Sequence, residues 1–156
     1  VVRGQLPHLE GHIAQKRAIY ERYKAGLAGL PVQMNPYDAA NSVPNFWLSC
    51  MLIDREAVGE GRGKTTPAKI LECLADMNAE GRPIWKPMHM QPVYRNHAFV
   101  TAAGKEGDRA FSGKEGADTS VGADIFARGL CLPSDNKMTP DQQDAIIATI
   151  RECFEG

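Results

Sequence analysis

The stretch FWLSCMLI, residues 46–53, decides the fold, because it is the strongest strand candidate in the chain. It is apolar or aromatic at nearly every position, as expected of a buried strand. Prolines at positions 31, 36 and 44 predict a loop over residues 31–44 before it. Glycines predict a second loop over residues 54–66 after it. The sequence therefore places one well-defined strand between two irregular segments.

A long helix is predicted upstream of this strand, over residues 6–30. Pro7 is tolerated only in a first turn, so the helix is expected to begin near it, and Gly29 and Pro31 end it. At 1.5 Å per residue it would be about 35 Å long, more than a small domain needs, so we expect it to bridge to another part of the protein. Apolar residues recur at helical spacing, at Leu6, Leu9, Ile13, Tyr20, Tyr23, Leu27 and Leu30.

Downstream, a second helix is expected to begin at Pro67, capped by Thr65 or Thr66, and to end at Gly81. Its buried stripe would be Ile70, Leu71, Leu74 and Met77. The next segments are predicted as an extended stretch (82–85), an ordered irregular loop (86–94) and a long glycine-containing excursion (95–119).

The C-terminal part is predicted to hold a short helix over 121–128, a strand over 130–132 and a final helix. Thr139-Pro140-Asp141-Gln142 is a capping box with proline at the first helical position. The apolar face of that helix is Ile146, Ile147, Ile150 and Phe154. The order of elements implies an α/β fold, with a small, mostly antiparallel sheet flanked by helices.

Bulk composition excludes several classes of protein. The chain has 156 residues, which suits one domain, and its formal net charge of −1 favours neither nucleic acid nor an anionic membrane as a partner. No apolar run approaches the roughly 20 residues of a membrane span, and the first ten residues lack a signal-peptide core. The four cysteines form no C-x-x-C pair, which favours free thiols in a reducing cytosol over a zinc site or a disulfide framework.

Two motifs resemble known sites but depart from them. GEGRGKT, residues 59–65, lies between a strand and a helix, yet its glycines enclose too few residues for a phosphate-binding P-loop, so a flexible loop is favoured. HLEGH, residues 8–12, spaces two histidines four apart, but its glutamate stands one place too late for a zinc protease. We interpret both histidines as surface residues and expect no metal site.

The most informative stretch is GRPIWKPMHMQPVY, residues 81–94. Prolines stiffen it, and it brings charged, aromatic and imidazole groups into a short length of chain. Rigid irregular loops of this kind build small-molecule sites. The residues alone leave open a structural proline-rich crossover with solvated charges.

Four ordered segments resemble the sugar aminotransferases of the DegT/DnrJ family. They are RGQL with KRAIYERY (3–6 and 16–23), FWLSCMLID (46–54), RPIWKPMHMQPVY (82–94) and RGLCLPS before the final helix (128–134). The resemblance covers the whole chain and implies the C-terminal small domain of the type I aminotransferase fold. It assigns residues 1–30 to an interdomain helix and residues 31–156 to the small domain.

The resemblance also implies a function. Family members move an amino group from glutamate to a keto sugar, usually nucleotide-linked, for cell-surface polysaccharide or glycan synthesis, and they act as cytoplasmic homodimers with pyridoxal phosphate. The Schiff-base lysine belongs to the large N-terminal domain, so this chain should hold no catalytic residue and bind no cofactor alone. His89 occupies the sugar side of the site, and Lys86, Tyr94 and Trp85 match neighbouring positions of the family pattern. The 95–119 excursion is longer than the family pattern leads us to expect.

Two further expectations concern the nature of the chain. It lacks an initial methionine and its first segment resembles a helix already under way, which predicts a fragment, although removal of a methionine before Val1 would look the same. The alternative function is a non-catalytic binding or dimerisation module derived from this domain.

Overall fold

The computed structural model describes residues 2–94, 97, 99–100, 106–107 and 120–155. The chain divides into two compact units. Unit 1 comprises Val1–Pro83 with Arg128–Gly156, and unit 2 comprises Ile84–Ala127.

Unit 1 is built on a four-stranded sheet in the order β1-β2-β6-β3, in which every neighbouring pair is antiparallel. The strands are β1 (Val32–Met34), β2 (Ser49–Ile53), β3 (Arg82–Pro83) and β6 (Gly129–Leu132). Alternate residues of β2 are buried, and Met51 is paired with Leu130 across the central strands. The small antiparallel sheet and its helices confirm the predicted α/β class.

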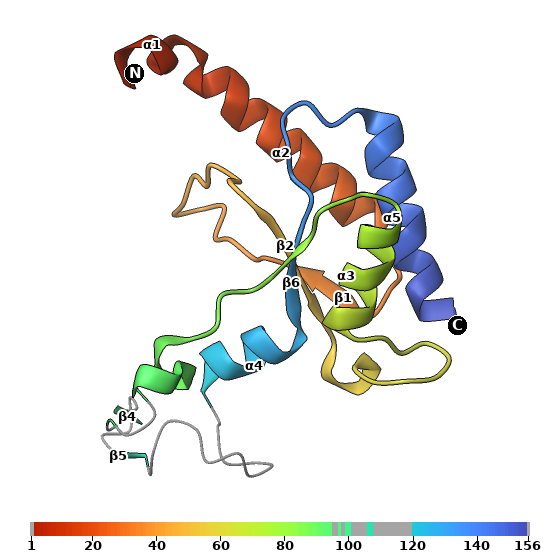
Figure 1. Ribbon diagram of the computed structural model, residues 1–156. Helices are drawn as coiled ribbons and strands as arrows, with labels where there is room; N and C mark the ends of the chain where they lie inside the picture. Colours follow the sequence, from red (N-terminus) through yellow and green to blue (C-terminus); the bar gives the residue numbers. More distant parts are fainter. Residues whose placement is uncertain (1, 95–96, 98, 101–105, 108–119, 156) are drawn as a thin grey trace. The chain divides into compact units, whose positions relative to one another are not determined.

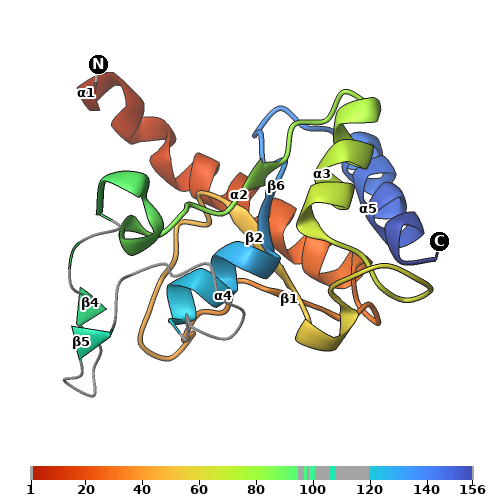
Figure 2. The same cartoon turned by 60° about the horizontal axis from the view of Figure 1, so that its bottom comes forward.

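Three helices form a layer beside this sheet: α2 (Leu9–Gly26), α3 (Pro67–Asp76) and α5 (Pro140–Glu155). Helix α5 packs on both α2 and α3, and the two views agree on this arrangement (Figure 1, Figure 2). A Cβ atom added to Gly26 would lie 2.6 Å from Cδ1 of Ile147, so the close approach of α2 to α5 requires glycine there.

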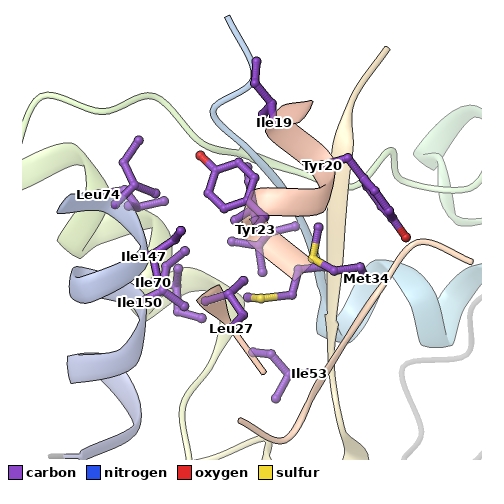
Figure 3. Packing of buried hydrophobic residues seen from close by; sticks show 14 of the residues in the cluster. Ile19, Tyr20, Tyr23, Leu27, Met34, Ile53, Ile70, Leu74, Ile147 and Ile150 are labelled. Carbon is purple, nitrogen blue, oxygen red and sulfur yellow. The ribbon is translucent and has the colours of Figure 1, made fainter. Parts of the chain in front are cut away.

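The hydrophobic core lies between the helices and the sheet. Figure 3 shows Leu74 of α3 and Ile150 of α5 directed toward Tyr23 and Leu27, at the C-terminal end of α2. The buried Tyr23 donates a hydrogen bond to the carbonyl oxygen of Pro133 at 2.8 Å, and burial raises the pKa of its hydroxyl. The buried hydroxyl of Tyr23 is therefore paired with the loop that follows β6.

The prediction for the first helix is wrong at both ends. Helical structure begins at α1 (Val2–Gln5), continues through a 3-10 turn at Leu6–His8 that accommodates Pro7, and ends with α2 at Gly26. The predicted apolar stripe is buried only at its C-terminal end, and Leu6 and Leu9 are 58% and 48% exposed. Helical spacing alone did not distinguish the part of the stripe that has a packing partner.

Three strand predictions need correction. The central strand starts at Ser49, because Phe46 has a left-handed backbone (φ 52) and Trp47 is exposed. The loop predicted over residues 31–44 contains β1, and the extended stretch predicted over 82–85 is a strand only at Arg82–Pro83. These strands have only two or three residues, too few to show a sequence pattern, so they are recognised only by their pairing with neighbouring strands.

Helix ends were predicted better than strands. Thr66 caps α3 through the N–H of Lys69, but α3 ends at Asp76 and Asn78 takes the left-handed position, so the predicted stop at Gly81 is wrong. Helix α4 (Val121–Arg128) has the predicted bounds. The capping box of α5 is confirmed in both directions, with Thr139 N–H donating to Gln142 Oε1 at 2.9 Å and Gln142 N–H donating to Thr139 Oγ1 at 3.3 Å.

Unit 2 contains two 3-10 turns, Met88–Met90 and Pro92–Tyr94, followed by β4 (Phe99–Val100), β5 (Glu106–Gly107) and most of α4. Strands β4 and β5 pair antiparallel. Most of the predicted 95–119 excursion lies outside the described residues. In the part of the chain that the structure describes, no helix has the length and apolar character needed to cross a membrane.

Candidate functional site

The predicted site residues lie together in unit 2, on the stretch that opens with Ile84. Each of its two 3-10 turns is closed by a backbone hydrogen bond: Met90 N–H donates to the carbonyl of Pro87 at 3.0 Å, and Tyr94 N–H donates to the carbonyl of Gln91 at 2.9 Å. Proline at 87 and 92 fixes φ close to the value such turns require. The irregular but ordered loop that the sequence predicted is therefore a pair of linked turns.

Gln91 closes the first of these turns. Its side-chain Nε2 donates to the carbonyl oxygen of Lys86 at 3.1 Å. Pro87 is held from the other side by Gly122, at the start of α4, where an added Cβ would lie 3.2 Å from Cγ of the proline. A larger residue at 122 would press on the turn that carries His89, so this glycine permits the approach of helix and turn.

His89 is half-buried, and its ring is oriented by Ser120. The Ser120 hydroxyl oxygen lies 3.1 Å from His89 Nε2 and accepts a hydrogen bond from the N–H of Ala123, also at 3.1 Å. Ser120 thus caps α4 and holds the imidazole at the same time.

The remaining predicted residues present large surfaces to solvent. Trp85 is 63% exposed, Lys86 is exposed, and Tyr94 packs edge-on against His97 with ring centroids 5.8 Å apart. One flat indole, one amine and one phenol therefore accompany the oriented imidazole within a short length of chain. Such a set can stack on a planar or sugar ring and bind phosphate or hydroxyl groups.

Sequence reasoning missed Ser120 and gave Gln91 no role. A serine immediately before a predicted helix is a recognisable cap, so the signal for Ser120 was present. Its contact with His89 was not predictable, because the two residues are 31 positions apart.

The two motifs rejected from sequence have other roles in the structure. In the 59–65 loop, Gly59 N–H donates to the carbonyl of Thr65 and Gly63 N–H to that of Phe154, so these amides do not converge on a phosphate. His8 and His12 are both exposed, as predicted, with their rings stacked at 6.4 Å. Among the described residues, no group of three or more histidine, cysteine or carboxylate side chains could hold a metal ion.

Two of the described lysines and one hydroxyl are engaged in contacts that do not suit pyridoxal phosphate. A Schiff base requires a lysine amine that can lose its proton. Lys16 donates to the carbonyl of Ser134, and the hydrogen bond from Lys69 to Glu72 raises the pKa of that lysine. The Thr66 hydroxyl, which could bind a phosphate, accepts the N–H of Lys69.

The sequence is similar to those of known aminotransferases. The model of the DegT/DnrJ/EryC1/StrS aminotransferase family matches residues 1–151. EpsN of Bacillus subtilis (strain 168), which carries the name of a pyridoxal phosphate-dependent aminotransferase, is 34% identical over 96% of this chain and 33% of its own length. The GDP-perosamine synthase of Vibrio cholerae is 31% identical over 96% of this chain and 35% of its own length. The chain thus spans about a third of the length of these relatives.

Solved structures agree on the fold. A DegT DnrJ EryC1 StrS aminotransferase from Brucella abortus superimposes with a TM-score of 0.71 at 20% identity, over 100% of this chain and 34% of the other. DesV of S. venezuelae, solved in complex with a ketimine intermediate, gives 0.67 at 22% identity, over 99% of this chain and 35% of the other.

Proposed function

Because the chain belongs to the DegT/DnrJ/EryC1/StrS aminotransferase family, we propose that it is the small-domain part of a pyridoxal-phosphate-dependent sugar aminotransferase. The full protein would transfer an amino group from glutamate to a nucleotide-linked keto sugar for cell-surface polysaccharide or glycan synthesis in the cytoplasm. The name of the Vibrio cholerae relative, a GDP-perosamine synthase, supports a nucleotide-sugar substrate.

The observation that carries the proposal is the oriented imidazole of His89. A histidine held by Ser120 at 3.1 Å, in a turn braced by Gln91, is positioned before any substrate arrives. Preorganised groups lose little entropy on binding. In our proposal His89 binds a hydroxyl or phosphate of the sugar nucleotide, and Lys86, Trp85 and Tyr94 bind its neighbouring parts.

The cofactor lysine would belong to a large N-terminal domain outside this chain, and the complete site would form in a homodimer. When bound there, pyridoxal phosphate supplies the carbanion stabilisation that amino transfer needs. The role of this chain is to bind and orient the sugar. The exposed Leu6 and Leu9 support the further proposal that α1 and the first half of α2 pack against the large domain.

The test is His89→Ala in the full-length enzyme, with Arg62→Ala, in the exposed 59–65 loop of unit 1, as the control. Loss of one substrate hydrogen bond should lower kcat/KM for the sugar about tenfold to a hundredfold. The glutamate half-reaction and the melting temperature should stay nearly unchanged, because His89 is not part of the core. Arg62, which is exposed and distant in sequence from the site turns, should give wild-type values in all three measurements.

A fall of many degrees in melting temperature, together with failure of both half-reactions, would show that His89 is structural. A separate measurement addresses the cofactor. After incubation with pyridoxal phosphate and desalting, the full-length protein should keep an aldimine absorbance band and this chain alone should not.

A further inference from the structure

Two cysteines that are far apart in sequence face each other on the central strands of unit 1. Cys50 of β2 and Cys131 of β6 are direct partners in the antiparallel register, and their sulfur atoms lie 3.6 Å apart. Cys50 N–H donates to Asn35 Oδ1 at 2.9 Å, and its carbonyl accepts from Asn35 N–H at 2.9 Å. Since both backbone groups of Cys50 point away from β6, the two cysteines form a non-hydrogen-bonded pair.

This geometry suits a covalent bond between the sulfurs. In a non-hydrogen-bonded antiparallel pair the Cα atoms are about 4.5 Å apart, within the range of about 4.4–6.8 Å that disulfides span. To form the bond, the two sulfurs would have to move closer together. The strand register would not have to change, because the two cysteines are already register partners.

We propose that Cys50 and Cys131 are a thiol-modification site, at which hydrogen peroxide or a small organic hydroperoxide forms a reversible cross-strand disulfide. The thiolate of one cysteine attacks the peroxide, the O–O bond breaks, and a sulfenic acid forms as water or an alcohol leaves. The second thiol then attacks the sulfenic sulfur and expels water. The two sulfurs lose two electrons in total, and the peroxide gains them.

The two cysteines lie in different environments. The hydrogen bond with Cys50 lowers the pKa of the Cys131 thiol, whereas that bond and burial raise the pKa of Cys50. Whichever thiol attacks the peroxide first, its partner sulfur lies 3.6 Å away and resolves the sulfenic acid. Because Cys131 is only 4% exposed, a small peroxide can react there and a bulky disulfide reagent cannot.

A second cysteine pair provides the comparison. Cys73 of α3 and Cys153 of α5 line the same hollow at the surface of unit 1. Burial and the neighbouring Cys73 raise the pKa of Cys153 to about 12, which leaves little thiolate at neutral pH. Cys153 should therefore not make the first attack on peroxide.

The crosslink would join residues 81 positions apart, and unit 2 would lie inside the covalent loop. Cys131 is also the register partner of Arg82 in β3, the last strand before unit 2. Closing so long a loop restricts the unfolded chain, so the oxidised protein should melt about 5–15 °C higher than the reduced protein.

The test treats the reduced, folded chain with stoichiometric hydrogen peroxide, alkylates the remaining thiols and maps the products by mass spectrometry. We expect a peptide crosslinked between Cys50 and Cys131, a raised melting temperature, and reversal of both by dithiothreitol. Cys73→Ser should keep the full response. Cys50→Ser should give neither the crosslink nor the rise in melting temperature, because the partner sulfur is missing.

Two outcomes would overturn the proposal. In one, the folded wild-type chain keeps all its thiols after peroxide treatment. In the other, the mapped crosslink joins Cys73 to Cys153. Both outcomes are measured on the wild-type chain, so the test remains valid even if a cysteine substitution prevents folding.

Discussion

Unit 1 and the site turns of unit 2 are held in shape by different forces. In unit 1 the large side chains Tyr23, Leu74 and Ile150 are fully buried, and the helices and sheet close around them. In unit 2, Trp85 and Val93 are 63% and 74% exposed, and the chain is shaped by prolines and short-range hydrogen bonds. Substitutions in unit 1 should therefore act on stability, and substitutions in the turns should act on ligand binding.

The largest expected effect is in the core. Leu74→Ala removes a fully buried side chain between α3 and α5 and should lower the free energy of unfolding by about 3 kcal/mol. Leu9→Ala, the matched leucine on the exposed part of α2, should change it by less than about 0.5 kcal/mol. Urea unfolding of the chain followed by circular dichroism measures both. Equal losses for the two leucines would mean that the first half of α2 is packed against something in solution.

A smaller effect is expected at Ser120. This residue acts on both stability and ligand binding, because it caps α4 and contacts His89. In the full-length enzyme, Ser120→Ala should raise KM for the sugar about fivefold through loss of the hydrogen bond that orients His89. It should also lower the melting temperature by about 2–4 °C through loss of the α4 cap.

Two other substitutions at this position separate the cap from the contact with His89. Ser120→Thr should restore both properties, whereas Ser120→Asn should restore the cap alone. Steady-state kinetics with the sugar and a thermal melt distinguish the four proteins. Recovery of KM in the asparagine variant would show that only the cap matters.

The smallest effect is expected on the surface of unit 1. Arg22 Nε donates to Asp144 Oδ1 at 2.8 Å, and this bond lowers the pKa of Asp144. Folding therefore favours the ionised carboxylate, and the contribution is present above the unfolded pKa of about 3.9 and lost as the pH falls through the folded value. Both side chains are exposed, so Arg22→Ala should lower the melting temperature by no more than about 2 °C at pH 7.

That difference between wild type and Arg22→Ala should shrink as the pH falls below about 3.9 and should vanish once the pH is below the lowered pKa of Asp144. Thermal melts across this pH range provide the check. A difference that persists at low pH would assign the loss to packing of the arginine stem.

Sequence-based predictions succeeded where the signal was local. The cap at Thr66, the bounds of α4 and the capping box of α5 each depend on residues within one helical turn. They failed where the neighbour was distant: β1 lies in a proline-bounded loop and becomes a strand only because β2 pairs with it. The predicted stop of α3 at Gly81 failed for a local reason, since Asn78 can also take the left-handed conformation.

The same division holds for the candidate site. The sequence alone located the stiff stretch at 82–94, selected His89 within it through a family resemblance, and determined the α/β class, because prolines, caps and apolar periodicity act over a few residues. Only the tertiary structure showed that Ser120 orients His89 and that Cys50 faces Cys131. These pairs are 31 and 81 positions apart in the sequence. Their contacts depend on packing and on strand register, which are properties of the whole fold, so no short sequence pattern predicts them.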